Sequence, residues 1–257
     1  VTSTKIDASY VTVKYYQDGT KVSEPTNAGT YTVKIDVTES GNYFAASGLN
    51  ANDWMFAIAK NTTTPTVTLD QYYSLTYKKS QLTPPVTVTI NGKSLTENVD
   101  YTVTYGKNID AGELAGSVTI NPMGNYEFRQ IVRSFTIDAR YIAVTASDKT
   151  SRVGQNLVAL TYTCTKGLPY EGDTFTGELA TNANKNTAGT YQITQGTLSL
   201  GNNYNIAFTP GTYTVEDKQP QTGFKFENAA VTKTYGNADF TITATGAVTG
   251  SSVTYSS

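Results

Sequence analysis

NAGTY at residues 27–31 and GNY at residues 41–43 form a pair of motifs that decides the fold. The second motif begins thirteen residues after the alanine of the first. The same pair, with the same offset, occurs twice more along the chain: DAG at 110–112 with GNY at 124–126, and TAGTY at 187–191 with GNNY at 201–204. Because the three alanines lie 83 and 77 residues apart, the repeating unit is a small domain and not a hairpin or a propeller blade.

Apolar and polar residues alternate between these motifs. Tyr31, Val33, Ile35 and Val37 follow this period of two, which indicates a strand with one buried face. Each copy also closes with a short alternating segment, at 56–58, 135–137 and 213–215. The Ala-Gly and Gly-Asn pairs fall between such segments, so we expect both to form tight turns that need positive φ angles.

The composition favours strands over helices throughout. The chain holds 45 threonines and 19 tyrosines, whereas only 16% of its residues are charged. β-Branched and aromatic side chains suit a half-buried pleated surface. We therefore expect an all-β protein of three tandem small β-sandwich domains of the immunoglobulin-like kind. A β-grasp-like fold is the alternative if a segment such as 168–179 is helical.

The repeat also predicts the domain boundaries. Pro-containing linkers at 60–65 and 216–220, and a very short joint at 138–140, limit how far neighbouring domains swing. The expected divisions are a first module at 1–60 that lacks its N-terminal part, a second at 61–138, a third at 139–217, and a linker with the start of a truncated fourth at 218–257. The chain reads as a piece of a longer precursor.

Charge and hydropathy argue against two classes of partner. The 19 basic and 21 acidic residues give a net charge of -2, so no basic field attracts nucleic acid or anionic lipid. No stretch approaches the roughly 20 apolar residues that a membrane-spanning helix needs. We expect neither nucleic-acid binding nor membrane insertion from this chain.

The residues that carry most enzyme chemistry are missing. The chain has no histidine, which removes the commonest general base and the commonest metal ligand. Cys164 lies in phase with Tyr162 on an alternating strand, so we interpret it as a small buried hydrophobe and not as a nucleophile. No phosphate loop or serine nucleophile elbow is present. We expect no catalytic residue, no metal, no cofactor and no enzymatic activity.

Three aromatic residues are the candidates for stacking on a ligand: Trp54, Tyr16 and Tyr73. Tyr16 and Tyr73 belong to adjacent tyrosine pairs, and in a strand one member of each pair points outward. Trp54, the single tryptophan, precedes the last strand of the first module. The burial habits of lone aromatics favour a core position for Trp54, and stacking on a sugar is the alternative.

The third module resembles the MBG-type modules that recur in bacterial surface proteins and have immunoglobulin-like and mucin-binding-protein-like relatives. The likeness rests on IAVTA at 142–146, LTY at 160–162, GDTFTG at 172–177, AGTY at 188–191 and NYNI at 203–206. It departs at 151–154, where the family usually has an aromatic before the glycine.

The other modules carry variants of the same likeness. The second is similar to a related form through GKSL at 92–95, DYTVTY at 100–105 and NIDAG at 108–112, and the first through YQDG at 16–19 and WMF at 54–56. The resemblance implies repetition, an extracellular or cell-surface location, and a spacer or adhesive role. It offers no residue-level site.

Together these observations predict a non-enzymatic repeat region of a bacterial surface or secreted protein, a stalk or spacer that presents an adhesive or catalytic domain. One alternative is a module that binds host or cell-wall carbohydrate or mucin, and another is a set of accessory domains of a secreted glycosidase or peptidase. We also expect head-to-tail self-association, in which residues 224–255 of one molecule add a strand to the first module of another. A stiffening Lys-to-Asn or Lys-to-Asp cross-link stays open.

Overall fold

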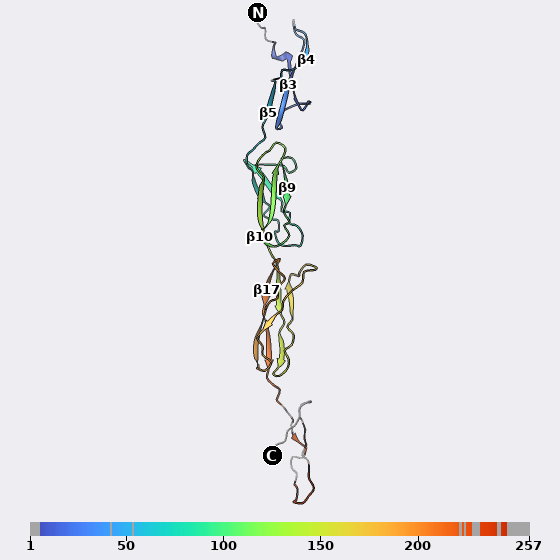
Figure 1. Cartoon of the computed structure of the whole chain (residues 1–257), viewed down its shortest axis with the longest axis vertical. Helices are drawn as coiled ribbons and strands as arrows, with labels where there is room; N and C mark the ends of the chain where they lie inside the picture. The colour runs from blue at the N-terminus through green and yellow to red at the C-terminus, as the bar shows by residue number, and fades with distance from the viewer. Residues whose placement is uncertain are drawn as a thin grey trace. The chain divides into compact units, whose positions relative to one another are not determined.

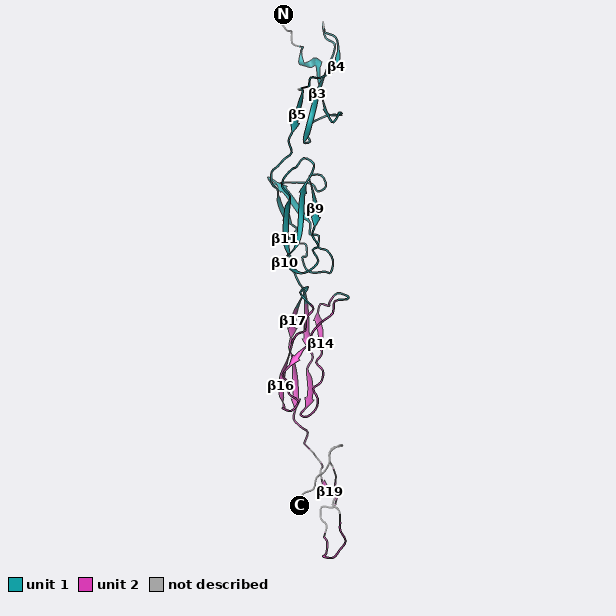
Figure 2. Ribbon diagram, viewed as in Figure 1, with its two compact units in different colours: residues 1–141, 170–172, 201–205 teal, residues 142–169, 173–200, 206–257 magenta. Residues whose placement is uncertain are grey.

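The computed structural model describes residues 6–41, 43–52, 54–220, 223, 225–227, 232–240 and 243–245 (Figure 1). The chain divides into two compact units (Figure 2). Unit 1 holds residues 1–141 with Tyr170–Gly172 and Gly201–Asn205, and unit 2 holds the remainder. Two short segments of the third repeat therefore belong to unit 1. The predicted module boundaries stay a prediction.

Five strands of the first repeat form one sheet. They are β1 (Val11–Gln17), β2 (Thr20–Val22), β3 (Gly29–Val37), β4 (Ala46–Leu49) and β5 (Met55–Ile58), after a single 3-10 turn at Ala8–Tyr10. Their order is β2-β1-β3-β4, and β5 also pairs with β3. The β1–β2 hairpin turns at Asp18 and Gly19, both with positive φ, as a two-residue Asp-Gly turn requires.

The second repeat is a sandwich of two three-stranded sheets. One sheet contains β6 (Thr66–Leu69), β7 (Val86–Ile90) and β8 (Lys93–Ser94), and the other contains β9 (Tyr101–Tyr105), β10 (Gly112–Pro122) and β11 (Ile131–Ile137). Val88 and Ile90 of the first sheet pack with Val118 and Ile120 of the second in one buried cluster. The apolar alternation of the sequence thus places one face of each sheet in the core.

The third repeat has the same two-sheet arrangement with more strands. One sheet has the order β14-β12-β17, formed by Tyr162–Lys166, Arg140–Ala146 and Tyr204–Thr209. The other has the order β13-β18-β16-β15, formed by Lys149–Arg152, Gly211–Glu216, Gly189–Thr194 and Ala180–Thr181. β13 runs parallel to β18. Ala146 of one sheet shares a buried cluster with Ile193, Tyr213 and Val215 of the other.

These observations confirm the all-β, sandwich-like fold. No α-helix occurs in the part of the chain that the structure describes, and residues 168–179 are not helical, so the condition for the β-grasp alternative is not met. For the described residues, no helix is long and apolar enough to cross a membrane. After the third repeat, the short strands β19 (Lys225–Phe226) and β20 (Ala244–Thr245) pair antiparallel. Most of the segment 224–255, expected to add a strand to another molecule, lies outside the described residues.

One expectation about turns is half wrong. The glycines of the three Gly-Asn motifs have positive φ angles, as predicted: Gly41 at 50°, Gly124 at 58° and Gly201 at 76°. The glycines of the Ala-Gly motifs instead begin strands β3, β10 and β16, and Gly112 and Gly189 have no positive φ. At Gly189 the small size of glycine matters instead, because a Cβ there would lie 3.3 Å from the Tyr191 hydroxyl oxygen and 3.4 Å from its ring.

Candidate functional site

The three candidate stacking residues do not form one site. Trp54 and Tyr16 belong to the first repeat and Tyr73 to the second, and no ring contact or hydrogen bond within the described residues joins any two of them. Trp54 is 38% exposed and precedes β5, so the favoured core position is wrong. Tyr16 is half-buried in β1, and the Lys34 ammonium lies 4.8 Å from its ring centroid. Ligand stacking by these residues stays a prediction.

Tyr73 is held by its own repeat. It lies in a turn and not in a strand, so the outward member of this tyrosine pair is Tyr72, which is 88% exposed. The Tyr73 hydroxyl accepts hydrogen bonds from the Thr83 amide and the Lys78 ammonium, each at 3.2 Å. The bond from the Thr83 amide is the main cause that lowers the pKa of Tyr73. Cys164, on β14, is half-buried and free instead of fully buried.

The repeated motifs meet in a contact that we call the first clasp, made by Asn27, Ala28 and Asn125. The Asn125 side chain accepts a hydrogen bond from the Ala28 amide at 2.7 Å through Oδ1. Its Nδ2 donates to Asn27 Oδ1 at 3.0 Å. The Asn125 carbonyl accepts from the amide of the linker residue Asn61 at 2.8 Å. Three groups of one asparagine thereby hold the Ala-Gly motif and the linker of the preceding repeat.

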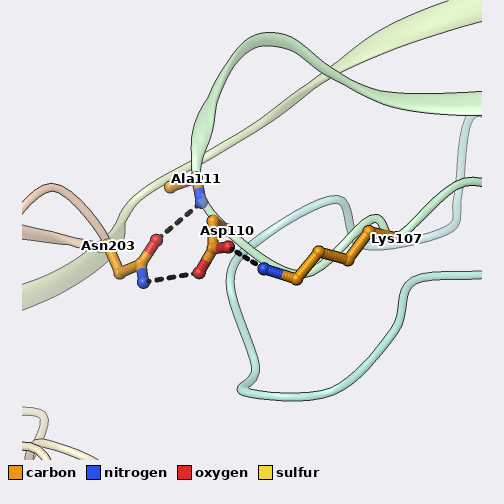
Figure 3. Close-up of polar contacts among 4 residues, drawn as sticks. All are labelled: Lys107, Asp110, Ala111 and Asn203. Carbon is orange, nitrogen blue, oxygen red and sulfur yellow. Dashed lines mark hydrogen bonds and ion pairs between the residues drawn. The ribbon is translucent and has the colours of Figure 1, made fainter.

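The same arrangement recurs as the second clasp, made by Asp110, Ala111 and Asn203 (Figure 3). All three residues lie in unit 1. Asn203 Oδ1 accepts from the Ala111 amide at 2.7 Å, and its Nδ2 donates to Asp110 Oδ1 at 3.2 Å. The Arg140 amide donates to the Asn203 carbonyl at 2.9 Å, as Asn61 does in the first clasp. An asparagine suits this position because its amide carries one acceptor and one donor side by side.

The second clasp carries a charge that the first lacks. Asp110 replaces Asn27, and the Lys107 ammonium lies 2.8 Å from Asp110 Oδ2. The bond from Lys107, followed by the bond from Asn203, lowers the pKa of Asp110 from its ordinary value of 3.8. Both partners are largely exposed, so the ion pair itself contributes little stability. Its effect is to keep Asp110 an ionised acceptor for Asn203.

A buried asparagine supports the loop that carries Asp110. Asn108 is 2% exposed and has a positive φ of 46°. Its Nδ2 donates to the Leu82 and Ser117 carbonyls at 3.0 Å each, and its Oδ1 accepts from the Ser117 amide at 2.8 Å. Every polar atom of this amide is therefore used, as burial requires. Asn108 fixes the backbone two residues before the clasp.

Aromatic packing reinforces the second clasp. Tyr204, next to Asn203, packs edge-on against Tyr77 with ring centroids 5.5 Å apart. The Tyr170 amide donates to the Tyr204 hydroxyl at 2.9 Å, and the Arg140 guanidinium lies 4.4 Å above the Tyr170 ring. Unit 1 contains all of these residues. Such contacts contribute roughly 0.5–1.5 kcal/mol per aromatic pair beyond the area that they bury.

A comparison with protein families identifies the repeat that supplies Asn203. Residues 142–214 match the MBG domain (YGX type). The match confirms the resemblance of the third repeat to MBG-type modules, although Val153 stands before Gly154 where an aromatic is usual. It covers one repeat, so the number of MBG-type copies stays a prediction. No curated protein and no solved structure matches the chain.

The clasps are the part of the site that the sequence did not reveal. Both motifs of the pair were expected to have a structural role, but only as turns within one repeat. A signal was available, because the asparagine of the second motif recurs in every copy while a turn needs only the glycine. In the first repeat the equivalent Asn42 lies outside the described residues.

Proposed function

We propose that the chain is a non-enzymatic repeat region of a bacterial surface or secreted protein, a stalk or spacer that presents an adhesive or catalytic domain. The observation that carries this proposal is the recurrence of the clasp, with the same atoms and nearly the same distances at 28/125 and 111/203. Side-chain and linker bonds at each junction oppose swinging between consecutive repeats, which a spacer requires in order to keep its reach.

Three further observations support this function. The match to the MBG domain connects the third repeat to modules that are typical of bacterial surface proteins. The second and third repeats each contain a buried core of their own, so each behaves as a structural unit. The absence of histidine from the sequence supports a role without catalysis.

The spacer proposal is tested by the stiffness of the chain. Small-angle X-ray scattering of the full chain is expected to give one maximum dimension that stays constant between low and high salt, because the clasps are mostly neutral hydrogen bonds. The double variant with Asn125→Ala and Asn203→Ala is expected to give a broader distribution of dimensions. A full chain as flexible as this double variant would contradict the spacer.

Carbohydrate or mucin binding is a second candidate, and exposed aromatics in the first repeat favour it. Phe44 is 89% exposed, Tyr43 43% and Trp54 38%. Aromatic faces open to solvent are the surfaces on which sugars stack. A glycan and mucin array is expected to show binding that Trp54→Ala removes and that Tyr72→Ala, a matched exposed aromatic in the second repeat, leaves intact. No binding by the folded chain would leave the spacer as the function.

A further inference from the structure

The third repeat presents the residues of a clasp without the asparagine that fills it. Thr187 and Ala188 occupy the positions of Asn27 and Ala28 in the TAGTY and NAGTY motifs. Lys218 occupies the position of Asn61 and Arg140. Each of these residues lies five positions after the aromatic residue of its last strand, which is Phe56, Phe135 or Tyr213. The further inference rests on the clasps of the proposed spacer and extends them.

The loop at Thr187 is folded like the loop at Asn27 in the first repeat. The Tyr191 hydroxyl donates to the Thr187 carbonyl at 3.0 Å, as the Tyr31 hydroxyl donates to the Asn27 carbonyl at 2.7 Å. In both repeats this bond from a tyrosine four residues later fixes the loop that enters the strand. The geometry of the loop is therefore set before any partner binds.

The equivalent backbone amides of the three copies differ in whether they have a hydrogen-bond acceptor. The amides of Ala28 and Ala111 donate to an asparagine side chain, and both residues are partly buried. Ala188 is exposed, and within the described residues no acceptor is found for its amide. Lys218 is also exposed, and within the described residues no acceptor is found for its amide. The equivalent amides of Asn61 and Arg140 donate to the carbonyl of the clasp asparagine.

We propose that Thr187, Ala188 and Lys218 form an open clasp that binds the Gly-Asn turn of a further repeat joined through Lys218. The incoming asparagine accepts from the Ala188 amide through Oδ1 and from the Lys218 amide through its carbonyl. Its Nδ2 donates to the Thr187 hydroxyl, which can accept as the Asn27 and Asp110 oxygens do. The interaction surface thus suits an asparagine side chain, because its amide places an acceptor and a donor on two separate atoms, whereas a carboxylate has no donor and a hydroxyl has only one atom for both bonds.

The occupant is a repeat in the same chain and not a second copy. A few hydrogen bonds between neutral groups give weak association between separate molecules, because each contributes only about 0.5–1.5 kcal/mol net. A covalent linker raises the effective concentration of the turn by orders of magnitude and also places the Lys218 amide next to it. The first two clasps join segments of one chain in this way.

Amide hydrogen exchange in four chains tests the open clasp. The first is the full chain. In the second, residues 141–217 follow Lys218 directly in place of 219–257, because Arg140 and Lys218 hold equivalent positions. The third is the second chain with Asn203→Ala in the added copy. A fourth chain carries 62–138 after Lys218, so that Asn125 of the added copy is the asparagine that accepts from the Ala188 and Lys218 amides, and it serves if the first added copy does not fold.

In the full chain, the Ala188 and Lys218 amides are expected to exchange much faster than the Ala111 amide. In an extended chain, exchange at Ala188 and Lys218 is expected to slow about tenfold or more, the effect of one well-formed bond. Asn203→Ala in the added copy returns Ala188 to its fast rate. Unchanged exchange at Ala188 beside a folded added copy would overturn the inference, as would protection in the full chain that grows with concentration. Fast exchange at Ala111 itself would instead contradict the clasps and the spacer.

Discussion

The Asn203 side chain accepts a hydrogen bond from the Ala111 amide at 2.7 Å, as the Asn125 side chain does from Ala28 at the same distance. Each asparagine directly precedes the tyrosine of its Gly-Asn motif, Tyr126 or Tyr204, and each bonds to the alanine of the preceding copy. The same hydrogen bonds therefore recur at two successive junctions, although the residues around them differ. The junction contacts are thus a feature of the repeat itself. The differences between the two clasps supply matched experiments.

Asn203→Asp is expected to weaken the second clasp, whereas Asn125→Asp is tolerated in the first. A carboxylate at 203 faces the ionised Asp110, and the repulsion between these like charges moves it away from the Ala111 amide, so that its hydrogen bond with Ala111 is lost. A carboxylate at 125 faces the Asn27 amide, which can rotate and donate. Exchange of the Ala111 amide is expected to accelerate about tenfold in Asn203→Asp, by the loss of one hydrogen bond. Adding Asp110→Asn should restore protection, and failure of this rescue would argue against the contact.

Acid is expected to loosen the second clasp and not the first. The folded pKa of Asp110 lies below its ordinary value of 3.8, so its contribution is present above that value and is lost as pH falls through the folded pKa. The first clasp has Asn27 in this position and does not titrate. NMR shifts of the Ala111 and Ala28 amides between pH 7 and 2 measure the difference. A titration at Ala111 that persists in Asp110→Asn would assign the effect to another group.

Asn108→Ala is expected to destabilise unit 1 by about 3 kcal/mol, because the substitution leaves buried backbone groups of Leu82 and Ser117 unpaired. Asn98→Ala is the matched control, since Asn98 also has a positive φ, of 63°, but is exposed. The strain of alanine at such an angle costs about 1 kcal/mol. Urea denaturation measures both, and equal losses would show that the side-chain bonds of Asn108 contribute nothing.

The Gly-Asn turns differ in how tightly they are packed. Gly124→Ala places a Cβ 2.5 Å from the Val99 carbonyl oxygen at a φ of 58°, whereas a Cβ at Gly201 meets nothing within 4 Å. We expect Gly201→Ala to cost about 1 kcal/mol from backbone strain alone. Gly124→Ala is expected to cost about 3 kcal/mol, since the carbonyl must also move. Thermal denaturation that ranks the two variants in the opposite order would contradict this description of the turns.

The sequence predicted the strands and their buried faces well, because a period of two follows directly from strand geometry. Ile142, Val144 and Ala146 are buried in β12, as their alternation requires. It did not predict the positions of single side chains. Trp54 is exposed just before β5, at the edge of its sheet. At such a position the neighbouring strands, and not the residue type, decide burial. The clasps were missed because their hydrogen bonds join residues 92 to 98 positions apart, and spacing within one repeat contains no information about contacts with the next.

The Asp110 position shows the same limit on a smaller scale. The sequence places an acidic residue where the first repeat has Asn27, which alone suggests a solvated turn. Only the structure brings Lys107 and Asn203 to its two oxygens. Charge patterning identifies candidates for pairing, but the pairing itself depends on the fold.

The distance distribution between spin labels on the first and second repeats, which both lie in unit 1, tests the central claim most directly. Labels at Thr12→Cys and Thr87→Cys, in a Cys164→Ser background, occupy exposed strand positions away from the clasp residues. The first clasp predicts one narrow distance distribution by pulsed electron paramagnetic resonance, which broadens when Asn125→Ala is added. A distribution that is already broad in the parent chain, or that Asn125→Ala leaves unchanged, would contradict the claim that the clasp holds successive repeats in place.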